Sequence, residues 1–255
     1  MSTETNTQNL IDRLFSVGAH FGFSKSRRHP SMKPFLFGSK QGTDIFDLEQ
    51  TVVMLDAAKE ALRVAGADGK KVLFVGTKEE ISRLVKERAE KAEVAYVTNR
   101  WIGGMLTNFS EIKKRINRLA ELTQEGESGE LERKYTKKER VMIGRESDKL
   151  SFNFGGIKNL EQPPQLMLIV DPRHDHIAST EARFLNIPVV AIMSSDNNSA
   201  HAKYPVVVND ALQASVSLVL DELTNAYLEG KATYVPKPTR TETRPRRTPE
   251  RRPVR

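Results

Sequence analysis

The sequence predicts an α/β protein built on a parallel sheet with helices on both faces. Two observations carry this prediction. Short apolar runs alternate along the chain with amphipathic helical segments, and strand–helix–strand spacing of this kind gives parallel pairing through right-handed crossovers. The runs, of which Leu166 to Val170 is one, are apolar at every position. Continuous apolar strands are typical of a sheet covered on both sides, so we expect three layers.

Each element has a local signal. Short apolar runs predict strands at 34–37, 43–46, 71–75, 94–97, 166–170 and 189–193. Apolar residues every three or four positions predict helices at 8–16, from Asp47 to the Gly66/Gly69 region, from Thr77, from about 174 to 185, and from Asn209 to Leu228. Asp47 and Thr77 each precede a glutamine or glutamate by three residues, which is the spacing of a capping box. Glycines at 18 and 230 are expected to end the first and last helices.

The segment 108–150 has no strand pattern. Asn108 with Glu111, and Thr136 with Glu139, have capping-box spacing. Phe109, Ile112, Ile116 and Leu119 follow the spacing of a coiled-coil seam. We predict a polar helical hairpin, with an antiparallel coiled coil, inserted into a sheet domain that comprises 1–107 and 151–230.

The charge of the chain is concentrated at its C-terminus. Residues 231–255 hold nine Lys or Arg and two Glu, so their net charge of +7 equals that of the whole 255-residue chain. They also hold five of the 12 prolines and almost no large apolar side chain. Such a segment cannot offset its ordering entropy by burial. We predict a basic, disordered tail suited to phosphate polymers, with Arg246 and Arg247 as contacts; a merely solubilising tail is the alternative.

Composition excludes several classes of protein. The chain has no cysteine, which rules out disulfides, thiolate metal sites and a cysteine nucleophile. Its longest aliphatic runs are far shorter than the ~20 residues of a membrane helix, and its first fifteen residues show no secretory or transit pattern. Gly76-Thr77-Lys78 lacks the rest of a phosphate loop, and no two glycines have dinucleotide-fingerprint spacing. We predict no bound cofactor.

One cluster favours enzyme chemistry. Asp171, His174 and His176 follow a predicted strand at the sheet edge where parallel sheets place ligands. Asp and His can hold a metal that activates water, so a metal-dependent phosphohydrolase is the rival hypothesis. A polar loop at a helix start, with Asp175 at the positive helix end, is the simpler interpretation. The sequence leaves open whether a structural metal is bound.

Two segments favour RNA binding. Between residues 16 and 43 there is no acidic side chain, and basic residues alternate there with aromatic ones. Cations for phosphates and rings for stacking suit an RNA surface, although we expect Phe35 and Phe37 to be core residues. The second segment, Arg100 to Asn108, contains the only tryptophan and the pair Gly103-Gly104. It is either an RNA contact or a strained elbow that leads into the hairpin.

These segments together resemble the universal small-subunit ribosomal protein family uS2 in its bacterial or organellar form. The resemblance covers about residues 8–230 and rests on motifs in order: 18–22 (GAHFG), 30–34 (PSMKP), 47–52 (DLEQTV), 71–78 (KVLFVGTK), 100–109 (RWIGGMLTNF), 155–158 (GGIK), 171–182 and 186–192 (NIPVVAI). One such motif is weak, but seven or more in the family's order are specific.

The resemblance implies a flavodoxin-like sheet with an inserted coiled-coil hairpin, and a structural, non-enzymatic role in the small ribosomal subunit. It implies binding to small-subunit rRNA and to neighbouring ribosomal proteins, including the mRNA-binding protein built of OB-fold repeats. The ribosome would be cytoplasmic, with an organellar ribosome not excluded. The expected rRNA contacts are His20, Lys25, Arg27, Arg28, Lys33, Arg100, Trp101, Asn108, Lys113, Lys114, Arg118, Arg246 and Arg247.

The chain departs from the family pattern at several positions. Phe23 stands where the family usually has a second histidine, and Arg28, His29 and Ser31 replace its usual Trp, Asn and Lys. The loops after Ile192 and before Ala211 also differ. Contacts at these points are therefore in doubt, and a paralogue that works off the ribosome is a third hypothesis.

Overall fold

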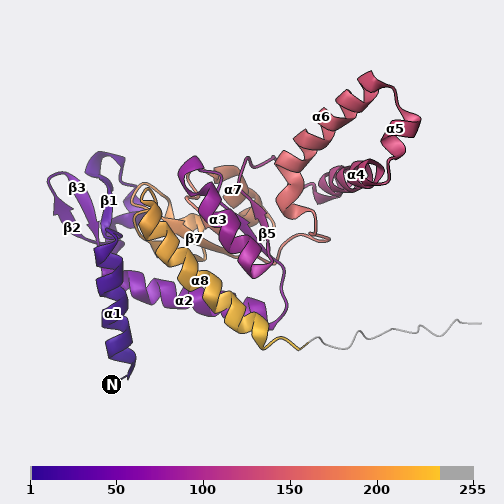
Figure 1. Cartoon of the computed structure of the whole chain (residues 1–255). Helices are drawn as coiled ribbons and strands as arrows, with labels where there is room; N and C mark the ends of the chain where they lie inside the picture. Colours follow the sequence, from indigo (N-terminus) through magenta and orange to yellow (C-terminus); the bar gives the residue numbers. More distant parts are fainter. Residues whose placement is uncertain (1, 236–255) are drawn as a thin grey trace, which may run out of the picture.

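The computed structural model describes residues 2–235, with side chains for 8–129 and 131–235 (Figure 1). Its main sheet has five parallel strands: β4 (Val72–Val75), β5 (Ala95–Val97), β6 (Leu166–Val170), β7 (Val189–Met193) and β8 (Tyr204–Val207). Their spatial order is β5-β4-β6-β7-β8. In chain order within this sheet that is 2-1-3-4-5, the order of flavodoxin-like sheets. The predicted α/β class and parallel pairing are confirmed.

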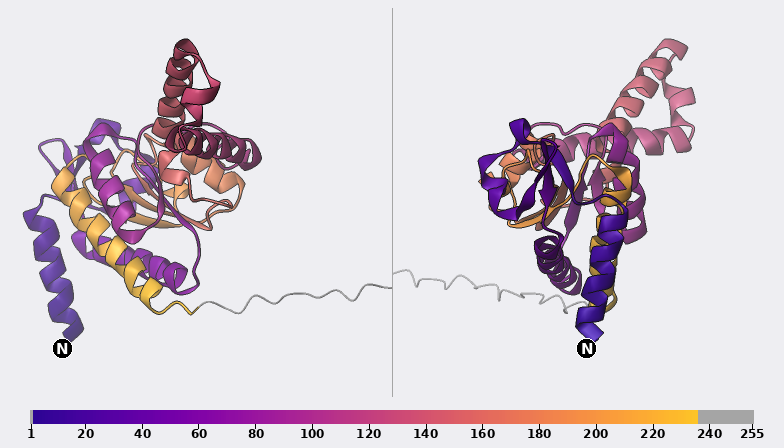
Figure 2. Two further views of the ribbon diagram at one scale, coloured as in Figure 1. Left: turned by 45° about the vertical axis from the view of Figure 1, so that its right-hand side comes forward. Right: turned by 90° about the vertical axis from the view of Figure 1, so that its left-hand side faces the viewer.

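Alternate residues of each strand enter two separate cores, as the period of two requires. Phe74 and Leu168 face one core, which also contains apolar side chains of α1 (Ser2–Ser16), α2 (Leu48–Ala67), α3 (Glu79–Ala92) and α8 (Gln213–Ala232). Leu73 and Met167 face the other, which contains side chains of α7 (His176–Phe184) and of the segment that follows β5. Figure 2 shows α2, α3 and α8 together on one side of the sheet.

A second, antiparallel sheet precedes the main one in the chain. It comprises β1 (Phe21–Ser24), β2 (Leu36–Lys40) and β3 (Thr43–Phe46) in the order β1-β3-β2. Between β1 and β2 the chain forms two 3₁₀ segments, η1 (Lys25–Arg27) and η2 (Pro30–Phe35). The strand predicted at 34–37 therefore begins later, because Pro30 and Pro34 favour a turn and cannot donate to a strand ladder. The short strands β1 and β8 were not predicted.

The segment predicted as a hairpin projects from the main sheet (Figures 1 and 2). It contains α4 (Phe109–Glu127), the short α5 (Glu130–Lys134), α6 (Lys137–Phe154) and the 3₁₀ turn η3 (Gly155–Ile157). Thr136 and Glu139 form the predicted capping box. Asn108 makes no capping hydrogen bond, contrary to prediction. The buried side chains of α6 are Leu150 and Phe154, both at its base, so coiled-coil pairing along the arm remains a prediction.

Two further helix boundaries differ from the sequence prediction. Thr77 does not cap α3, which begins at Glu79, because its amide and hydroxyl donate to Asp175 on the neighbouring loop. Asn209 does not cap α8, which begins at Gln213. That helix continues through Gly230 to Ala232, so the start of the predicted tail is helical; the predicted tail contacts Arg246 and Arg247 lie outside the described residues.

Gly230 does not end α8 but allows this helix to pack closely against α2. α8 crosses α2 so closely that a Cβ on Gly230 would lie 2.0 Å from the carbonyl oxygen of Arg63. On the other helix, a Cβ on Gly66 would lie 2.5 Å from the carbonyl oxygen of Tyr227. These two glycines allow the backbones of the two helices to touch.

We expect Gly230→Ala to destabilise the protein by about 1–3 kcal/mol, since the added methyl group must push α8 away from α2. The measurement is the midpoint of urea unfolding. The matched control is Gly144→Ala in the interior of α6, where an added Cβ meets nothing within 4 Å. There the better helix propensity of alanine should stabilise by about 0.5–1 kcal/mol. Equal midpoints for the two variants would contradict the close packing.

Candidate nucleic-acid interface

The loop after β5 is organised around one carboxylate. Glu181 lies on α7 with its side chain buried, and its Oε1 accepts hydrogen bonds from Trp101 Nε1 (3.2 Å) and the amide of Gly104 (2.8 Å). Its Oε2 accepts from the amides of Leu106 (3.0 Å) and Thr107 (3.1 Å), and from the hydroxyl of Thr107 (3.2 Å). Gly104 has a φ of +87°, a conformation that favours glycine. The loop thus wraps an anion that belongs to the chain itself.

Two opposing effects set the charge of Glu181. Burial by itself raises the pKa of this carboxyl group, but the hydrogen bonds from the loop outweigh burial, and its pKa is lowered. The carboxylate is therefore the form that holds the loop.

This geometry corrects the prediction for Trp101. Its side chain is only 6 % exposed and its single donor is bound to Glu181, so the ring offers no face to RNA. Two other residues of the same motif are exposed: Arg100 and Asn108, which lie at the ends of the loop. The elbow interpretation of the motif holds for the tryptophan, while the exposed ends remain candidate contacts.

The basic residues of the small sheet are partly exposed and partly bound within the chain. Arg28 binds buried Asp44 through both ends of its guanidinium group, with Nε 2.8 Å from Oδ2 and Nη2 against Oδ1. The hydrogen bonds to Asp44 raise the pKa of Arg28. Its charge thus neutralises a buried carboxylate, which removes it from the candidate contacts. Lys25, Arg27 and Lys33 are exposed, and Arg27 lies over the Phe23 ring at 5.6 Å.

His20 lies inside an aromatic group. Its ring stacks on Phe15 at 4.4 Å and meets Phe21 at 4.0 Å between centroids. Burial lowers the pKa of His20, and its Nδ1 has no hydrogen-bond partner among the described residues. A neutral, half-buried imidazole is a poor phosphate ligand, so its role here is to pack between rings.

The exposed side of this group forms an aromatic patch, which we define as Phe15, Phe21 and Phe37. Phe37 is 81 % exposed, which contradicts the expectation that it is a core residue, whereas Phe35 packs partly buried against the core. Phe37 lies on β2 in the edge position of the small sheet, where no further layer covers it. A cavity of about 590 Å³ adjoins the patch and is also lined by Lys40, Asp47 and Glu49.

The predicted contacts of the arm lie at its base on α4. Lys113 donates to the carbonyl oxygen of Glu161 (3.2 Å), and Lys114 pairs with Glu111 (2.6 Å). Arg118 is half-buried and lies 3.5 Å and 3.7 Å from carboxylate oxygens of Glu121 and Glu146. Lys113 and Lys114 remain exposed.

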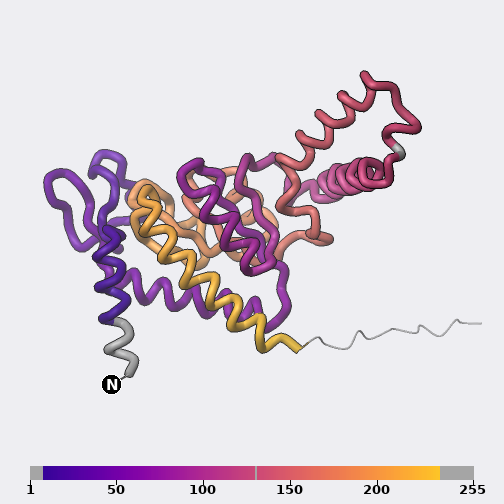
Figure 3. The backbone as a smooth tube through the Cα atoms, viewed as in Figure 1, coloured from indigo at the N-terminus to yellow at the C-terminus, as the bar shows by residue number. Residues whose placement is uncertain are grey.

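The predicted contacts therefore do not form one cluster. The small sheet lies at one end of the molecule and the arm at the other, as the tube in Figure 3 shows. We call the two sets the small-sheet surface (Lys25, Arg27, Lys33) and the arm-base surface (Arg100, Asn108, Lys113, Lys114, Arg118).

The carboxylate of Asp171, the acid of the rival enzyme hypothesis, is held by other residues of the chain. Asp171 pairs with Lys78 (3.2 Å) and also accepts from the amides of Arg173 and His174. Asp175 is bound to Thr77. Within the part of the chain that the structure describes, no group of three or more His, Asp or Glu side chains is placed to hold a metal ion.

Asp210 completes this edge of the sheet. It is fully buried, and burial together with repulsion by Asp171 raises its pKa to about 8. Burial of this carboxyl group therefore favours its protonated form.

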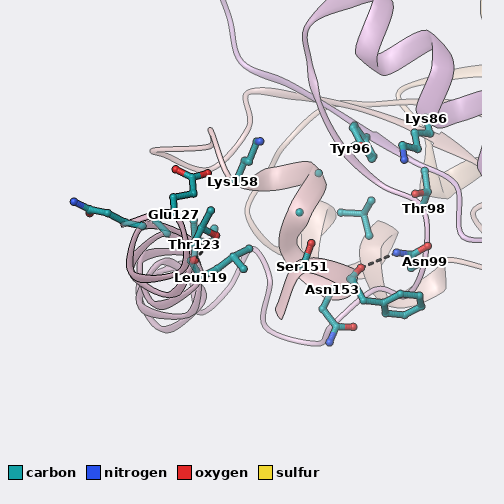
Figure 4. A pocket seen from close by; sticks show the side chains of 17 residues that line it. Lys86, Tyr96, Thr98, Asn99, Leu119, Thr123, Glu127, Ser151, Asn153 and Lys158 are labelled. Carbon is teal, nitrogen blue, oxygen red and sulfur yellow. Dashed lines mark hydrogen bonds between the residues drawn. The ribbon is translucent and has the colours of Figure 1, made fainter. Parts of the chain in front are cut away.

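The largest cavity that we describe, of about 680 Å³, lies between β5, α4 and the end of α6. Figure 4 shows Asn99 donating to the carbonyl oxygen of Phe152 across one wall (2.6 Å) and Lys158 at the rim. None of its lining residues was predicted as a contact. No helix in residues 2–235 is long and apolar enough to cross a bilayer.

Comparison with known proteins gives one consistent result. The family model described as "Ribosomal protein S2" matches residues 14–230. "Small ribosomal subunit protein uS2" of Solidesulfovibrio magneticus is 41 % identical over 222 residues, which is 87 % of this chain and 86 % of that protein. The proteins of the same name from Pseudoalteromonas translucida and Fusobacterium nucleatum are 42 % and 39 % identical, over 86 % of this chain and 90 % and 89 % of their own.

We expect Glu181→Gln to destabilise the protein by about 2–4 kcal/mol. The NH₂ group of the new side chain would face N–H groups of the loop, and the negative charge that strengthens the present hydrogen bonds would be lost. The lowered pKa of Glu181 stabilises the fold above the pKa of the unfolded chain, about 4.3. That contribution is lost as pH falls through the folded pKa. The melting temperature should therefore fall more steeply between pH 6 and pH 3 for the parent protein than for the variant. An equal fall for the two proteins would contradict this role of Glu181.

Proposed function

The chain belongs to the ribosomal protein S2 family, and from this premise we infer that it is a structural protein of the small ribosomal subunit. The observation that carries the conclusion is the length of the match, which spans both halves of the main sheet and the arm between them. The family is structural and non-enzymatic, and the relatives are named as subunit proteins. The protein takes part in translation as a component of the ribosome.

We propose that it binds small-subunit rRNA through two separate sets of cations. Lys25, Arg27 and Lys33 supply the small-sheet surface. Arg100 and Lys113, with Asn108 and the ion-paired Lys114 and Arg118 beside them, supply the arm-base surface. Each ammonium or guanidinium group that meets a phosphate releases condensed counterions, so affinity should fall steeply with salt. Two surfaces at opposite ends suit a protein that bridges separate rRNA elements.

The arm and the sheet have different tasks in this proposal. Residues 1–107 and 151–230 form the sheet domain that carries the small-sheet surface and Arg100, and residues 108–150 form a coiled-coil hairpin whose base carries the rest of the arm-base surface. The basic segment after the sheet domain adds non-specific attraction to RNA. The ribosome in question is expected to be cytoplasmic, and an organellar ribosome would use the same surfaces.

The aromatic patch fits a protein neighbour better than RNA. Phe15, Phe21 and Phe37 offer large exposed rings, and such rings are common anchors of protein interfaces. The cavity beside them is lined by Asp47 and Glu49 against one Lys40, so its net charge is negative and unfavourable for a phosphate. We propose that the patch receives the mRNA-binding ribosomal protein built of OB-fold repeats.

The rRNA surfaces are tested by charge removal. We expect Arg100→Gln with Lys113→Gln and Lys114→Gln to lower the slope of log affinity for small-subunit rRNA against log salt by about 2–3, since each phosphate contact contributes about 0.7–0.9. The matched control removes three exposed charges elsewhere: Arg83→Gln, Lys91→Gln and Lys203→Gln. Sucrose gradients at moderate salt report subunit association. Failure of the unaltered protein to sediment with small subunits would contradict the ribosomal role itself.

The aromatic patch is tested by Phe37→Ser, a change at an exposed position that should leave the fold intact. We expect binding to the purified OB-fold-repeat protein to weaken by about 2 kcal/mol, roughly 30-fold in Kd, while rRNA affinity is unchanged. Phe184→Ser on α7 is the control, because that ring is also largely exposed but lies outside the patch. Loss of rRNA binding by Phe37→Ser alone would instead assign the patch to RNA.

A further inference from the structure

A third basic surface lies at the amino-terminal edge of the main sheet, apart from the two surfaces above. A groove of about 610 Å³ opens between the end of α2, the starts of β4 and β5, η3 and the end of α8. None of its residues was named from the sequence as an rRNA contact. We call it the amino-edge groove.

Four lysines line the amino-edge groove: Lys70, Lys71, Lys158 and Lys231. Two of them are neutralised, because Lys70 pairs with Asp68 (2.8 Å) and Lys231 with Glu93 (2.6 Å). Lys71 and Lys158 are exposed and make no ion pair with any side chain that the structure describes. The groove therefore presents two uncompensated cations that come from different elements.

The carboxylates of the groove do not cancel this charge. Glu93 is held by Lys231, whose hydrogen bond and charge lower its pKa. Glu90 accepts the hydroxyl of Tyr96 (3.0 Å) and lies 3.9 Å from Lys86 on the outer side of α3. Both acids are thus partnered within the chain, and the unpaired charge facing the groove is positive.

An aromatic ring stands at the mouth of the groove. Tyr234, 42 % exposed, packs over Gly69, where a Cβ would lie 2.4 Å from the ring. Gly69 also has a φ of +67°, so both the contact with the ring and the backbone conformation favour glycine at this position. A tyrosine that packs on the backbone and keeps this much of its surface exposed can stack with an unpaired base.

The chain beyond the groove has the same sign of charge. Tyr234 and Val235 are the last described residues, and residues 236–255 carry eight Lys or Arg against two Glu. Charge repulsion makes this segment an unsuitable occupant for a groove lined by lysines. Instead, both would attract one polyanion, because the basic segment begins at the groove's mouth.

The groove also adjoins the arm. Tyr96, Gly155, Gly156 and Lys158 line both the amino-edge groove and the cavity beside α4 that Figure 4 shows. An extended polyanion that lies in the groove can therefore continue past Lys158 toward the arm.

We propose that the amino-edge groove binds a single-stranded stretch of rRNA, with Lys71 and Lys158 on its phosphates and Tyr234 against a base. This inference rests on the proposed ribosomal function and adds a third RNA surface to it.

The test uses the full-length protein and small-subunit rRNA over a range of salt. We expect Lys71→Gln with Lys158→Gln to lower the log-affinity slope by about 1.4–1.8, since two phosphate contacts are lost. The matched control, Arg83→Gln with Lys203→Gln, removes the same charge from exposed sites away from the groove and should leave the slope unchanged. A groove variant that matches this control would overturn the inference. Absence of rRNA binding by the parent protein would instead refute the proposed function.

A second experiment identifies the occupant. A photo-crosslinking amino acid placed at Asn159, an exposed position in the groove wall, should attach to rRNA when assembled subunits are irradiated. The same group at Ala57, exposed on α2, is the control and should give no rRNA product. Attachment of Asn159 to a ribosomal protein, with no rRNA product, would show that the groove is a protein interface and would overturn the proposal.

Discussion

The carboxylate of Glu181 joins two parts of the molecule that are distant in sequence. It sits on α7 against the main sheet, and it holds the loop from Trp101 to Thr107 by hydrogen bonds to three backbone amides, a hydroxyl and an indole. A buried carboxylate is tolerated only when it is satisfied in this way. The loop in turn sets where α4 begins, so the direction of the arm and the placing of Arg100 both depend on this interaction.

The carboxyl edge of the main sheet, where flavodoxin-like folds usually bind ligands, is occupied by the chain's own side chains. Lys78 pairs with Asp171, Thr77 binds Asp175, and Asp210 is buried behind them. The exposed cations of the proposed RNA surfaces lie elsewhere: on the small sheet, at the arm base and in the groove at the amino-terminal edge of the main sheet. In this proposal the fold is a scaffold, and the binding surfaces lie around it.

Particular elements show how far sequence reasoning reached. β6 and β7 were predicted at their observed bounds, because a strand buried on both faces is an unbroken apolar run. β8 was missed, since it is short, lies at the sheet edge and contains Pro205, which edge strands tolerate. Thr77 and Asn209 are residue types that often cap helices, yet Thr77 is bound to Asp175 and α8 begins only after Leu212. A tertiary contact overrode local preference at Thr77, whereas Asn209 accepts instead from the nearby amide of Ala211.

The sequence by itself determined the α/β class, the parallel pairing, the family motifs and the concentration of charge after residue 230, because each depends on residue type and spacing along the chain. The tertiary structure decided which side chains are free to act. Arg28 and Lys25 are neighbours with the same charge, but only Arg28 faces the buried Asp44. Lys71 and Lys158 belong to separate motifs of the sequence and line one groove only in the folded chain. Partners of a charge are set by distance in space, which the order of residues does not reveal.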